Sequence, residues 1–255
     1  MERLSNLFFE LASEDRLMIL LKLQENPTRL TQISEKLNLT VQETSRHLSR
    51  LSEAKLITKN ADGMYRLLPF GQDLLHLLPG YEFFSKHRDY LNTHDLSNLP
   101  KEFLNRIGEL EKCTFLDDVF AALHLADNVI REAKDYIWII GNQVLMSTVP
   151  LLEEAIKAGA TFLLILPEDL VPPPGFKPLP YVPGRIERRT KKQVNVTIIM
   201  SEKEARVAFP TIDGKMDPSA FASTEPIPHK WCKDLFEYYW RNAFRGQPKG
   251  YPTAP

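Results

Sequence analysis

Two successive stretches near the N-terminus carry apolar residues at helical spacing. The first, TQISEKL at 31–37, places Ile33 and Leu37 on one face and is followed by a turn at 38–40. The second, at 41–54, repeats the pattern over a longer run. Its apolar side consists of Val41, Thr44, Leu48 and Leu51. The chain is therefore expected to form two helices joined by a tight turn.

The start and the polar side of the second helix carry separate signals. Thr40 stands at the N-cap position with Glu43 three residues on, which predicts a capping box. The side opposite the apolar stripe holds an arginine, a glutamine and a hydroxyl, which are side-chain types that read base edges. A solvated helix face is the alternative explanation for its arginines. This polar side consists of Gln42, Arg46, Ser49, Arg50 and Glu53.

An extended run follows the second helix and turns back on itself. Residues 57–60 and 64–68 flank Ala61-Asp62-Gly63, and Asp-Gly is a favoured pair for a tight turn. Helix, turn, capped helix and hairpin in this order predict a winged helix-turn-helix, which holds a helix in a groove of double-stranded DNA. Lys59 and Arg66 on the hairpin are expected to contact phosphates or the minor groove.

Residues 11–57, which read LASEDRLMILLKLQ…TRLTQISEKLNLTVQETSRHLSRLSEAKLI, resemble the arsenic-repressor (ArsR) type of winged helix, most closely at Ser45-Arg46-His47-Leu48. The resemblance implies that residues at 44–47 lie near the groove, although His47 also fits a helix-packing role. Lys55 replaces the glycine usual after the second helix, so a left-handed helix end there would be strained. The metal-sensing cysteine motif is absent. The predicted DNA-binding set is Thr40, Gln42, Thr44, Ser45, Arg46, His47, Arg50, Lys59 and Arg66.

The rest of the chain alternates between helical patterns and short apolar runs. Two continuous apolar strands, 136–141 and 161–166, flank a helix at 145–158, which makes a βαβ unit with a parallel strand pair. The fold class is therefore a winged helix followed by an α/β sheet domain, α+β overall. Further helices are expected at 3–11, 14–24, 69–78, 82–92, 100–111, 117–133 and 228–245, and further strands at 194–200, 205–209 and near Phe221.

From Tyr90 to Arg245 the chain also resembles the middle domain of archaeal methanogenesis-regulator-like transcription factors. The segments that carry this resemblance are HDLSNLP, REAKDYIWIIGNQ, SEKEARVAFPTIDGKMD and WCKDLFEYYW. The resemblance implies a fold similar to one half of a phospholipase D-like domain, used as a sensor. Domains are expected at 1–79 (DNA binding), 80–115 (helical linker and dimerisation), 116–246 (ligand sensing) and 247–255 (flexible tail).

A ligand site is expected where the strands of the βαβ unit end. Gly141-Asn142-Gln143 follows the first strand and Glu168 the second, and ligands collect at the carboxyl ends of strands in open α/β sheets. Arg185 and Arg188, in the basic cluster 185–192, are expected to close the site over an anionic effector. The alternatives are a strand-to-helix turn with polar caps and a solvated charged segment.

Phosphodiesterase chemistry of the phospholipase type requires a histidine with a lysine two residues further on. Here Lys230 follows His229 directly, so the chain is predicted not to be an enzyme. A phosphodiester-processing enzyme with a tethered DNA module is the alternative. The aromatic stripe of 231–240 is expected to be core, with a ligand cage as the other possibility.

Composition narrows the remaining possibilities. The chain has 255 residues and a net charge of −1, so affinity for DNA must come from locally placed basic side chains. Cys113 and Cys232 are expected to be buried thiols, not a disulfide or a metal site. No apolar run is long enough to cross a bilayer. The sequence predicts a cytoplasmic homodimer without a cofactor or a metal.

Overall fold

The computed structural model describes residues 1–180 and 182–251. The chain divides into two compact units, Met1–Tyr81 and Glu82–Pro255. The predicted fold class is confirmed, since a winged helix is followed by a mixed α/β domain. Within the described residues, no helix has the length and apolar character needed to cross a membrane.

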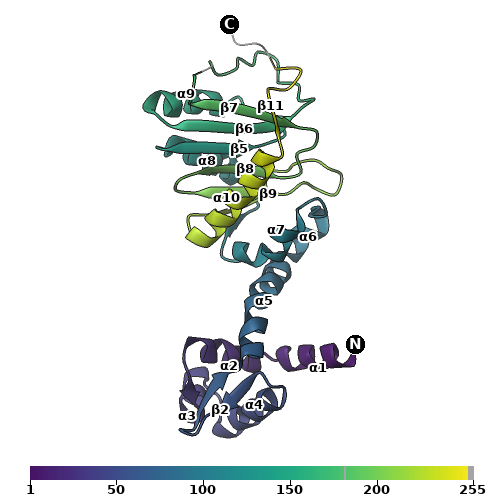
Figure 1. The fold of residues 1–255 in the computed structure, drawn as a ribbon, viewed down its shortest axis with the longest axis vertical. Coiled ribbons are helices and arrows are strands. Elements are labelled where there is room, and N and C mark those ends of the chain that lie inside the picture. The colour runs from purple at the N-terminus through teal and green to yellow at the C-terminus, as the bar shows by residue number, and fades with distance from the viewer. Residues whose placement is uncertain (181, 252–255) are drawn as a thin grey trace. The chain divides into compact units, whose positions relative to one another are not determined.

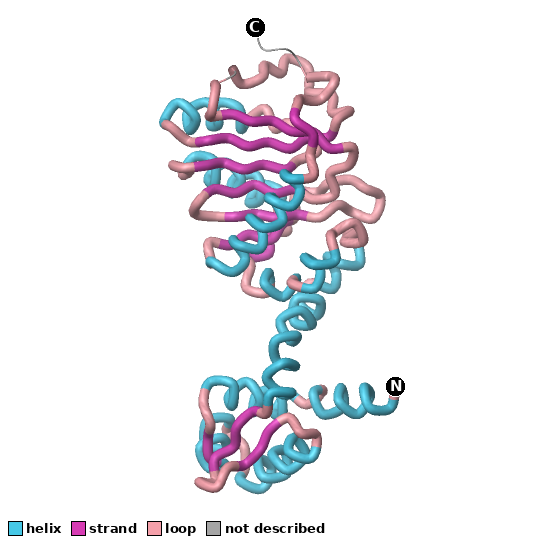
Figure 2. Tube along the Cα trace, in the orientation of Figure 1, coloured by secondary structure: helices cyan, strands magenta, loops and turns pink. Residues whose placement is uncertain are grey.

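The first unit packs its helices around a short three-stranded sheet of order β1-β3-β2. Its core joins the apolar stripes of two helices to the hairpin, through Ile33, Leu48 and Leu67. The hairpin strands are visible in Figure 2, and the two-residue strand β1, which pairs with β3, was not foreseen. The elements are α1 (Glu2–Leu11), α2 (Glu14–Glu25), β1 (Thr28–Arg29), α3 (Leu30–Leu37), α4 (Val41–Glu53), β2 (Ile57–Lys59) and β3 (Met64–Leu67).

Helix α5 (Pro69–Lys86) corrects the expectation that Pro79-Gly80 ends a helix. Proline removes one backbone donor and crowds the preceding turn, which usually breaks a helix. Here the apolar pattern continues on both sides of Pro79. Leu75 is buried in the core of the first unit and Phe83 in the core of the second, so packing holds both ends of the helix.

The second unit contains an eight-stranded sheet of order β11-β7-β6-β5-β8-β9-β10-β4. The predicted βαβ unit is present: β5 and β6 are parallel and pair Tyr136 with Thr161. Strand β7 extends the parallel part, and the remaining neighbours are antiparallel. The strands are β4 (Thr114–Leu116), β5 (Tyr136–Ile140), β6 (Thr161–Pro167), β7 (Ile186–Lys191), β8 (Thr197–Ser201), β9 (Ala205–Ala208), β10 (Ala220–Ser223) and β11 (Phe244–Arg245).

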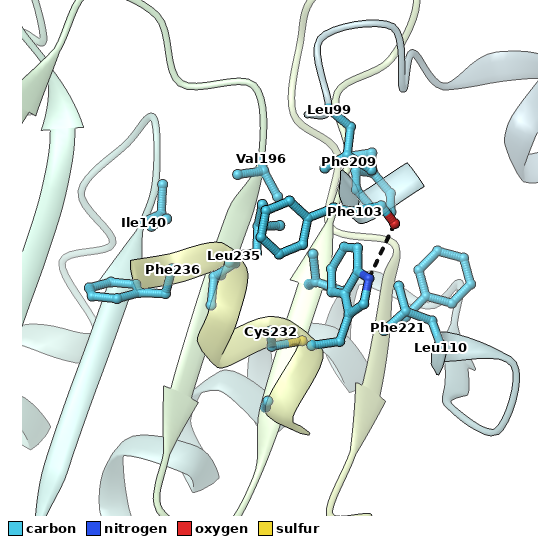
Figure 3. Close-up of a cluster of buried hydrophobic side chains, with 14 of the residues drawn as sticks. Leu99, Phe103, Leu110, Ile140, Val196, Phe209, Phe221, Cys232, Leu235 and Phe236 are labelled. Carbon is cyan, nitrogen blue, oxygen red and sulfur yellow. Dashed lines mark hydrogen bonds between the residues drawn. The ribbon is translucent and has the colours of Figure 1, made fainter. Parts of the chain in front are cut away.

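Helices cover both faces of this sheet. Helices α8 (Val119–Arg131) and α9 (Thr148–Ala158) pack on one face, and α10 (Pro226–Arg241) crosses the other, as Figure 1 shows. On the α10 face, the indole Nε1 of Trp231 donates a hydrogen bond to the carbonyl of Phe103 at 3.3 Å (Figure 3). The aromatic stripe of α10 is therefore mainly core, as expected.

The segment 82–115 belongs to the core of the second unit, and is not a separate linker. Tyr90 and Phe103 from this segment are buried with Phe221 of the sheet. The two helices expected at 82–92 and 100–111 are each divided, because the backbone leaves the helical conformation at His87 and at Arg106. These elements are α6 (Arg88–Thr93), α7 (Lys101–Asn105) and the 3-10 helix η1 (Ile107–Leu110).

Three other expectations are resolved by packing. Cys113 and Cys232 are free, buried thiols, and burial raises the pKa of Cys113 to about 12. The basic cluster 185–192 is mostly strand β7, since strand pairing with β6 overrides its polarity. The tail was predicted to be flexible, but Tyr251 is buried against Phe176 with ring centroids 4.9 Å apart. Residues 252–255 of the predicted tail lie outside the described residues.

Candidate functional site

Helix α4 is fixed at both ends by hydrogen bonds within its own sequence. The Thr40 hydroxyl accepts from the Glu43 amide at 3.2 Å, and the Glu43 carboxylate accepts from the Thr40 amide at 3.0 Å. These bonds lower the pKa of Glu43. At the other end Lys55 is left-handed, with φ of 60°, and the Leu56 amide donates to the Leu51 carbonyl at 3.0 Å. The predicted cap and the predicted left-handed end are both present.

The side of α4 that faces away from the core is exposed and polar. Arg46 is exposed and has no ion-pair partner within the described part of the chain. Its guanidinium is therefore available to an outside acceptor, such as a guanine edge or a phosphate. The other exposed residues of this side are Gln42, Ser45 and Ser49.

Arg50 is held by helix α1. Its Nε donates to Glu10 Oε2 at 3.0 Å and its Nη2 to Glu10 Oε1 at 2.5 Å, while its guanidinium lies 5.1 Å from the centroid of the Phe9 ring. The hydrogen bond from Arg50 lowers the pKa of Glu10. The Nε and Nη2 edge of the Arg50 guanidinium is used within the chain, which distinguishes Arg50 from Arg46 one helical turn earlier.

The hairpin adds two exposed cations to the same unit. Lys59 and Arg66 are both exposed, and the Lys59 ammonium lies 5.6 Å from the Tyr65 ring centroid. At the tip, the Asn60 side chain accepts from the Met64 amide at 2.8 Å, and Gly63 has a φ of 81°. These local bonds fix the conformation of the loop, so both cations project from a hairpin of defined conformation.

Helix α1 carries an apolar surface that its own unit covers only in part, through contacts such as Phe8 with Tyr81. None of its residues is buried, and Leu4, Phe8 and Phe9 are 47%, 45% and 60% exposed. Contiguous exposed apolar side chains of this size mark interaction surfaces in soluble proteins.

The second unit encloses a cavity of about 340 Å³ between the α8/α9 face of the sheet and the chain around 176–179. The carboxyl end of β5 opens into it, and Gly141, Asn142 and Gln143 line it. Most other lining side chains are apolar. They include Ile139, Phe162, Leu164 and Ile199 from strands, Leu123, Ile130 and Leu152 from helices, and Phe176, Leu179 and Tyr251 from loops.

One end of this cavity carries a buried arginine. Arg206 on β9 is 5% exposed, and its Nη2 donates to the Pro218 carbonyl at 2.5 Å. Its Nε is buried and has no hydrogen-bond partner among the described residues. Burial lowers the pKa of Arg206, and the charges of Tyr90 and Asp217 oppose that shift.

A histidine and an aspartate meet beside Arg206. His94 Nε2 lies 2.9 Å from Asp217 Oδ2, and His94 Nδ1 lies 2.8 Å from the Tyr90 carbonyl. The Asp217 carboxylate lines the cavity and also accepts from the Ser219 amide at 2.8 Å. Among the described residues, no group of three or more His, Cys, Asp and Glu side chains is arranged to hold a metal ion.

Comparison with protein families assigns the helix-turn-helix. Residues 13–59 match the family described as bacterial regulatory protein, arsR family. The N-terminal unit carries an ArsR-family helix-turn-helix. The matched segment runs from the N-cap of α2 to the end of β2 and so contains the whole of α4. No curated protein matches the chain in sequence.

Solved structures share parts of the arrangement at low identity. TrmBL2, an archaeal chromatin protein with a novel mode of DNA binding, is 12% identical with a TM-score of 0.44, over 92% of this chain and 94% of its own. Nuc from Salmonella typhimurium, a phospholipase D family member, is 14% identical with a TM-score of 0.37, over 49% and 90%. NucT from Helicobacter pylori is 9% identical with a TM-score of 0.41, over 53% and 99%.

The ArsR-type unit corrects part of the predicted DNA-binding set. Thr44 and His47 are buried, because they fall on the same side of α4 as Leu48 and Leu51. The Thr44 hydroxyl donates to the Thr40 carbonyl at 2.9 Å, and His47 Nε2 lies 3.4 Å from an Asp15 carboxylate oxygen. Both side chains pack inside the unit and lie off the exposed polar side of α4, which fits the helix-packing role for His47. Arg50 is engaged by α1. The residues that remain exposed are Thr40, Gln42, Ser45, Arg46, Lys59 and Arg66.

Only some of the predicted ligand residues line the cavity. Gly141, Asn142 and Gln143 line the cavity, whereas Arg185 and Arg188 border a separate groove. The backbone of Glu168 pairs with Lys191 and Lys249, and its side chain does not line the cavity. Arg185 donates to the Gly159 carbonyl. Arg188 still contacts the wall of the cavity, because its Nη2 donates to the Leu179 carbonyl at 3.0 Å and its guanidinium lies 5.7 Å from the centroid of the Tyr251 ring.

Sequence reasoning missed Arg206 and Asp217. The signal for Arg206 was present, because ARVAF places one charged residue inside an apolar strand. A charge within such a run is either paired in the core or directed at a site. Asp217 gave no local signal, since its position beside Arg206 comes from the return of the chain after β9.

Proposed function

We propose that the protein is a transcription regulator that binds double-stranded DNA through α4 and the β2–β3 hairpin. The observation that carries this proposal is the exposed polar side of α4, with an unpaired Arg46 on a helix capped at both ends. A rigid helix with a free arginine meets the requirement of base recognition, which is a donor pair held at a fixed place. Because such a regulator acts where DNA is, we assign it to the cytoplasm.

We propose that the active form is a homodimer. The support is the apolar surface of α1, where Phe8 and Phe9 are exposed, and the neighbouring helix α2 adds Met18 and Leu21 at 46% and 43% exposure. A two-fold dimer would present two copies of α4 to half-sites about one helical turn apart, roughly 34–36 Å along the duplex.

We propose that the second unit regulates DNA binding by holding a small effector in its cavity. A cavity of about 340 Å³ with apolar walls and a few polar groups has the character of a ligand site. An effector changes DNA affinity only by the difference between its affinities for the DNA-competent and incompetent states. A difference of about 1–3 kcal/mol is typical of such coupling.

We propose that the protein has no phosphodiesterase activity. His229 Nε2 lies 2.7 Å from the Ser201 carbonyl, and Lys230 forms an ion pair with Asp234 at 2.7 Å. Both groups are therefore occupied by structural partners. Hydrolysis of bis(p-nitrophenyl) phosphate is expected to stay at the rate without protein, and turnover lost in His229→Ala would support the enzyme instead.

The DNA-binding proposal is tested by the salt dependence of binding. Affinity of the full chain for duplex DNA is expected to fall steeply with salt, because local phosphate contacts must supply it at a net charge of −1. Lys59→Ala and Arg66→Ala should each weaken binding to all sequences alike and flatten the log–log salt slope by about one unit. Arg131→Ala, which removes an exposed arginine from α8, is the matched control. Unchanged affinity in the Lys59/Arg66 double variant would remove the hairpin from the interface.

A further inference from the structure

The walls of the cavity in the second unit specify the body of its ligand. They include Phe162 and Leu164 from the sheet, Leu152 from α9 and Phe176 from a loop, which pack in one apolar cluster. Removing apolar surface from water is favourable by about 25 cal/mol for each Å², whereas polar atoms against these walls would lose hydrogen bonds to water. The ligand body is therefore hydrocarbon, aliphatic or aromatic, and not a sugar.

The arginine at one end of the cavity specifies the head group. Arg206 is buried, with only 5% of its surface exposed. Among the described residues, no carboxylate lies within 4.0 Å of its nitrogens. Its single hydrogen bond goes to the Pro218 carbonyl, which leaves Nε without a partner. A buried charge without a counter-ion is costly, and a guanidinium fork matches the two oxygens of a carboxylate.

The aspartate beside Arg206 is held by other partners. Asp217 Oδ2 lies 2.9 Å from His94 Nε2, and Asp217 Oδ1 accepts from the Ser219 amide at 2.8 Å. Among the described residues, Asp217 makes no ion pair with Arg206 within 4.0 Å. The guanidinium therefore remains open to an anionic head group.

We propose that the cavity binds a monocarboxylate with an apolar body, whose carboxylate pairs with Arg206. The inference rests on the proposed effector role of the second unit and names the chemical class of that effector. Two observations carry it: the apolar walls, and the buried arginine whose Nε has no partner and which has no carboxylate within 4.0 Å among the described residues.

The experiment is calorimetric titration of the full chain with sodium decanoate, with sodium 4-phenylbutyrate and with decan-1-ol. Both carboxylates are expected to bind, and decanoate at least tenfold more tightly than the alcohol, since a charge-assisted bond is worth roughly 1.5–3 kcal/mol. Arg206→Met should remove this preference while keeping the apolar walls. Arg189→Met, on the same sheet but bonded to the Trp240 carbonyl outside the cavity, should retain it.

Two further measurements keep the proposal falsifiable if Arg206→Met does not fold. The wild-type ratio of decanoate to decanol affinity needs no variant, and Leu123→Trp fills the rim of the cavity from a partly exposed position on α8. Equal affinity for the acid and the alcohol, or no binding of either carboxylate, overturns the proposal. Decanoate binding that survives Leu123→Trp unchanged places the site elsewhere and also overturns it.

Operator affinity separates this inference from the proposed function. If decanoate binds through Arg206 but leaves DNA affinity unchanged, the ligand class stands and the effector role fails. If neither carboxylate binds while the full chain still binds DNA with the expected salt slope, the ligand class fails and the DNA-binding proposal stands.

Discussion

The surface of α4 and the cavity of the second unit are built in opposite ways. The two ends of α4 and the division of its sides are set by features within a few residues in sequence: the Thr40–Glu43 cap, the Leu56–Leu51 bond and the alternation of buried and exposed sides. The cavity is instead lined by residues from 119 to 251. It is lined both by Arg206 and by Asp217, and the partner of Asp217 is His94. Arg46 is available to an outside acceptor because its side chain is exposed. Arg206 is available through its Nε, which has no partner among the described residues, because its side chain lines the cavity.

This difference indicates which changes would disrupt each site. A site made from one helix depends on the core beneath that helix and on its two ends. A site made from distant segments depends on the fold of a whole domain and on buried polar groups whose partners are fixed at long range. Changes in the two units are therefore expected to act separately.

The largest expected effect comes from the core under α4. Leu51→Ala should lower the free energy of unfolding of the first unit by about 2–5 kcal/mol, because Leu51 is fully buried between α4 and the hairpin. Ser49→Ala, two residues away on the exposed side, should change it by less than about 0.5 kcal/mol. Urea unfolding gives both values. A Leu51→Ala protein that loses decanoate binding along with stability would show that the units do not act separately.

The end of α4 gives a smaller effect with the opposite sign. Lys55 has a φ of 60°, which a residue with a Cβ adopts at a cost of roughly 1 kcal/mol. Lys55→Gly is expected to stabilise the first unit by about 0.5–1 kcal/mol. Ala54→Gly is the matched control, since Ala54 is right-handed with φ of −70° and should lose stability. The two variants are compared by thermal unfolding, and destabilisation by both would contradict the strain at Lys55.

A buried histidine makes the second unit sensitive to acid. Burial lowers the pKa of His87, with Lys86 adding to the shift and Glu111 opposing it, and its Nε2 has no partner among the described residues. Because protonation then favours the unfolded chain, stability is complete above the ordinary histidine pKa of about 6.5 and falls as the pH drops below it. Unfolding at about pH 7.5 and pH 5.5 measures the loss.

His87→Phe is expected to reduce that loss, since the ring lies among Phe83, Phe115 and Phe221 with centroids 4.8–5.4 Å away. His124→Gln, at an exposed position of α8, should leave the pH dependence as it is. An identical dependence in His87→Phe and the wild type would assign the acid sensitivity to other groups.

The same contrast explains what could be predicted from the sequence. The capped helix, its exposed side and the hairpin followed from spacing alone, because local bonds and periodicity determine them. Gly141–Gln143 followed from the βαβ unit, whose strand ends are set by chain direction. Thr44 and His47 were included in the DNA-binding set because the family resemblance places the matching residues near the groove. Their angle around the helix instead puts both on the buried side. Arg50 was misplaced because its partner, Glu10, lies 40 residues away.

The cavity shows where such reasoning ends. Strand β7 looked like a solvated basic segment, and only its pairing with β6 shows where its arginines lie. Arg185 borders a separate groove, whereas Arg188 bonds to the Leu179 carbonyl beside the cavity. Tyr251 was placed in a flexible tail, yet it lines the cavity. Long-range packing determines these positions, and they cannot be predicted from the local spacing of residues.

The most direct test of the account is the affinity of Arg46→Ala and Arg50→Ala for a selected operator and for random DNA. If Arg46 reads a guanine edge, its loss should cost about 1–3 kcal/mol on the operator and much less on random DNA. Arg50→Ala should show no such difference between the two DNAs, since Glu10 and Phe9 hold its guanidinium. Equal losses on operator and random DNA for Arg46→Ala, or an operator-specific loss confined to Arg50→Ala, would contradict the account.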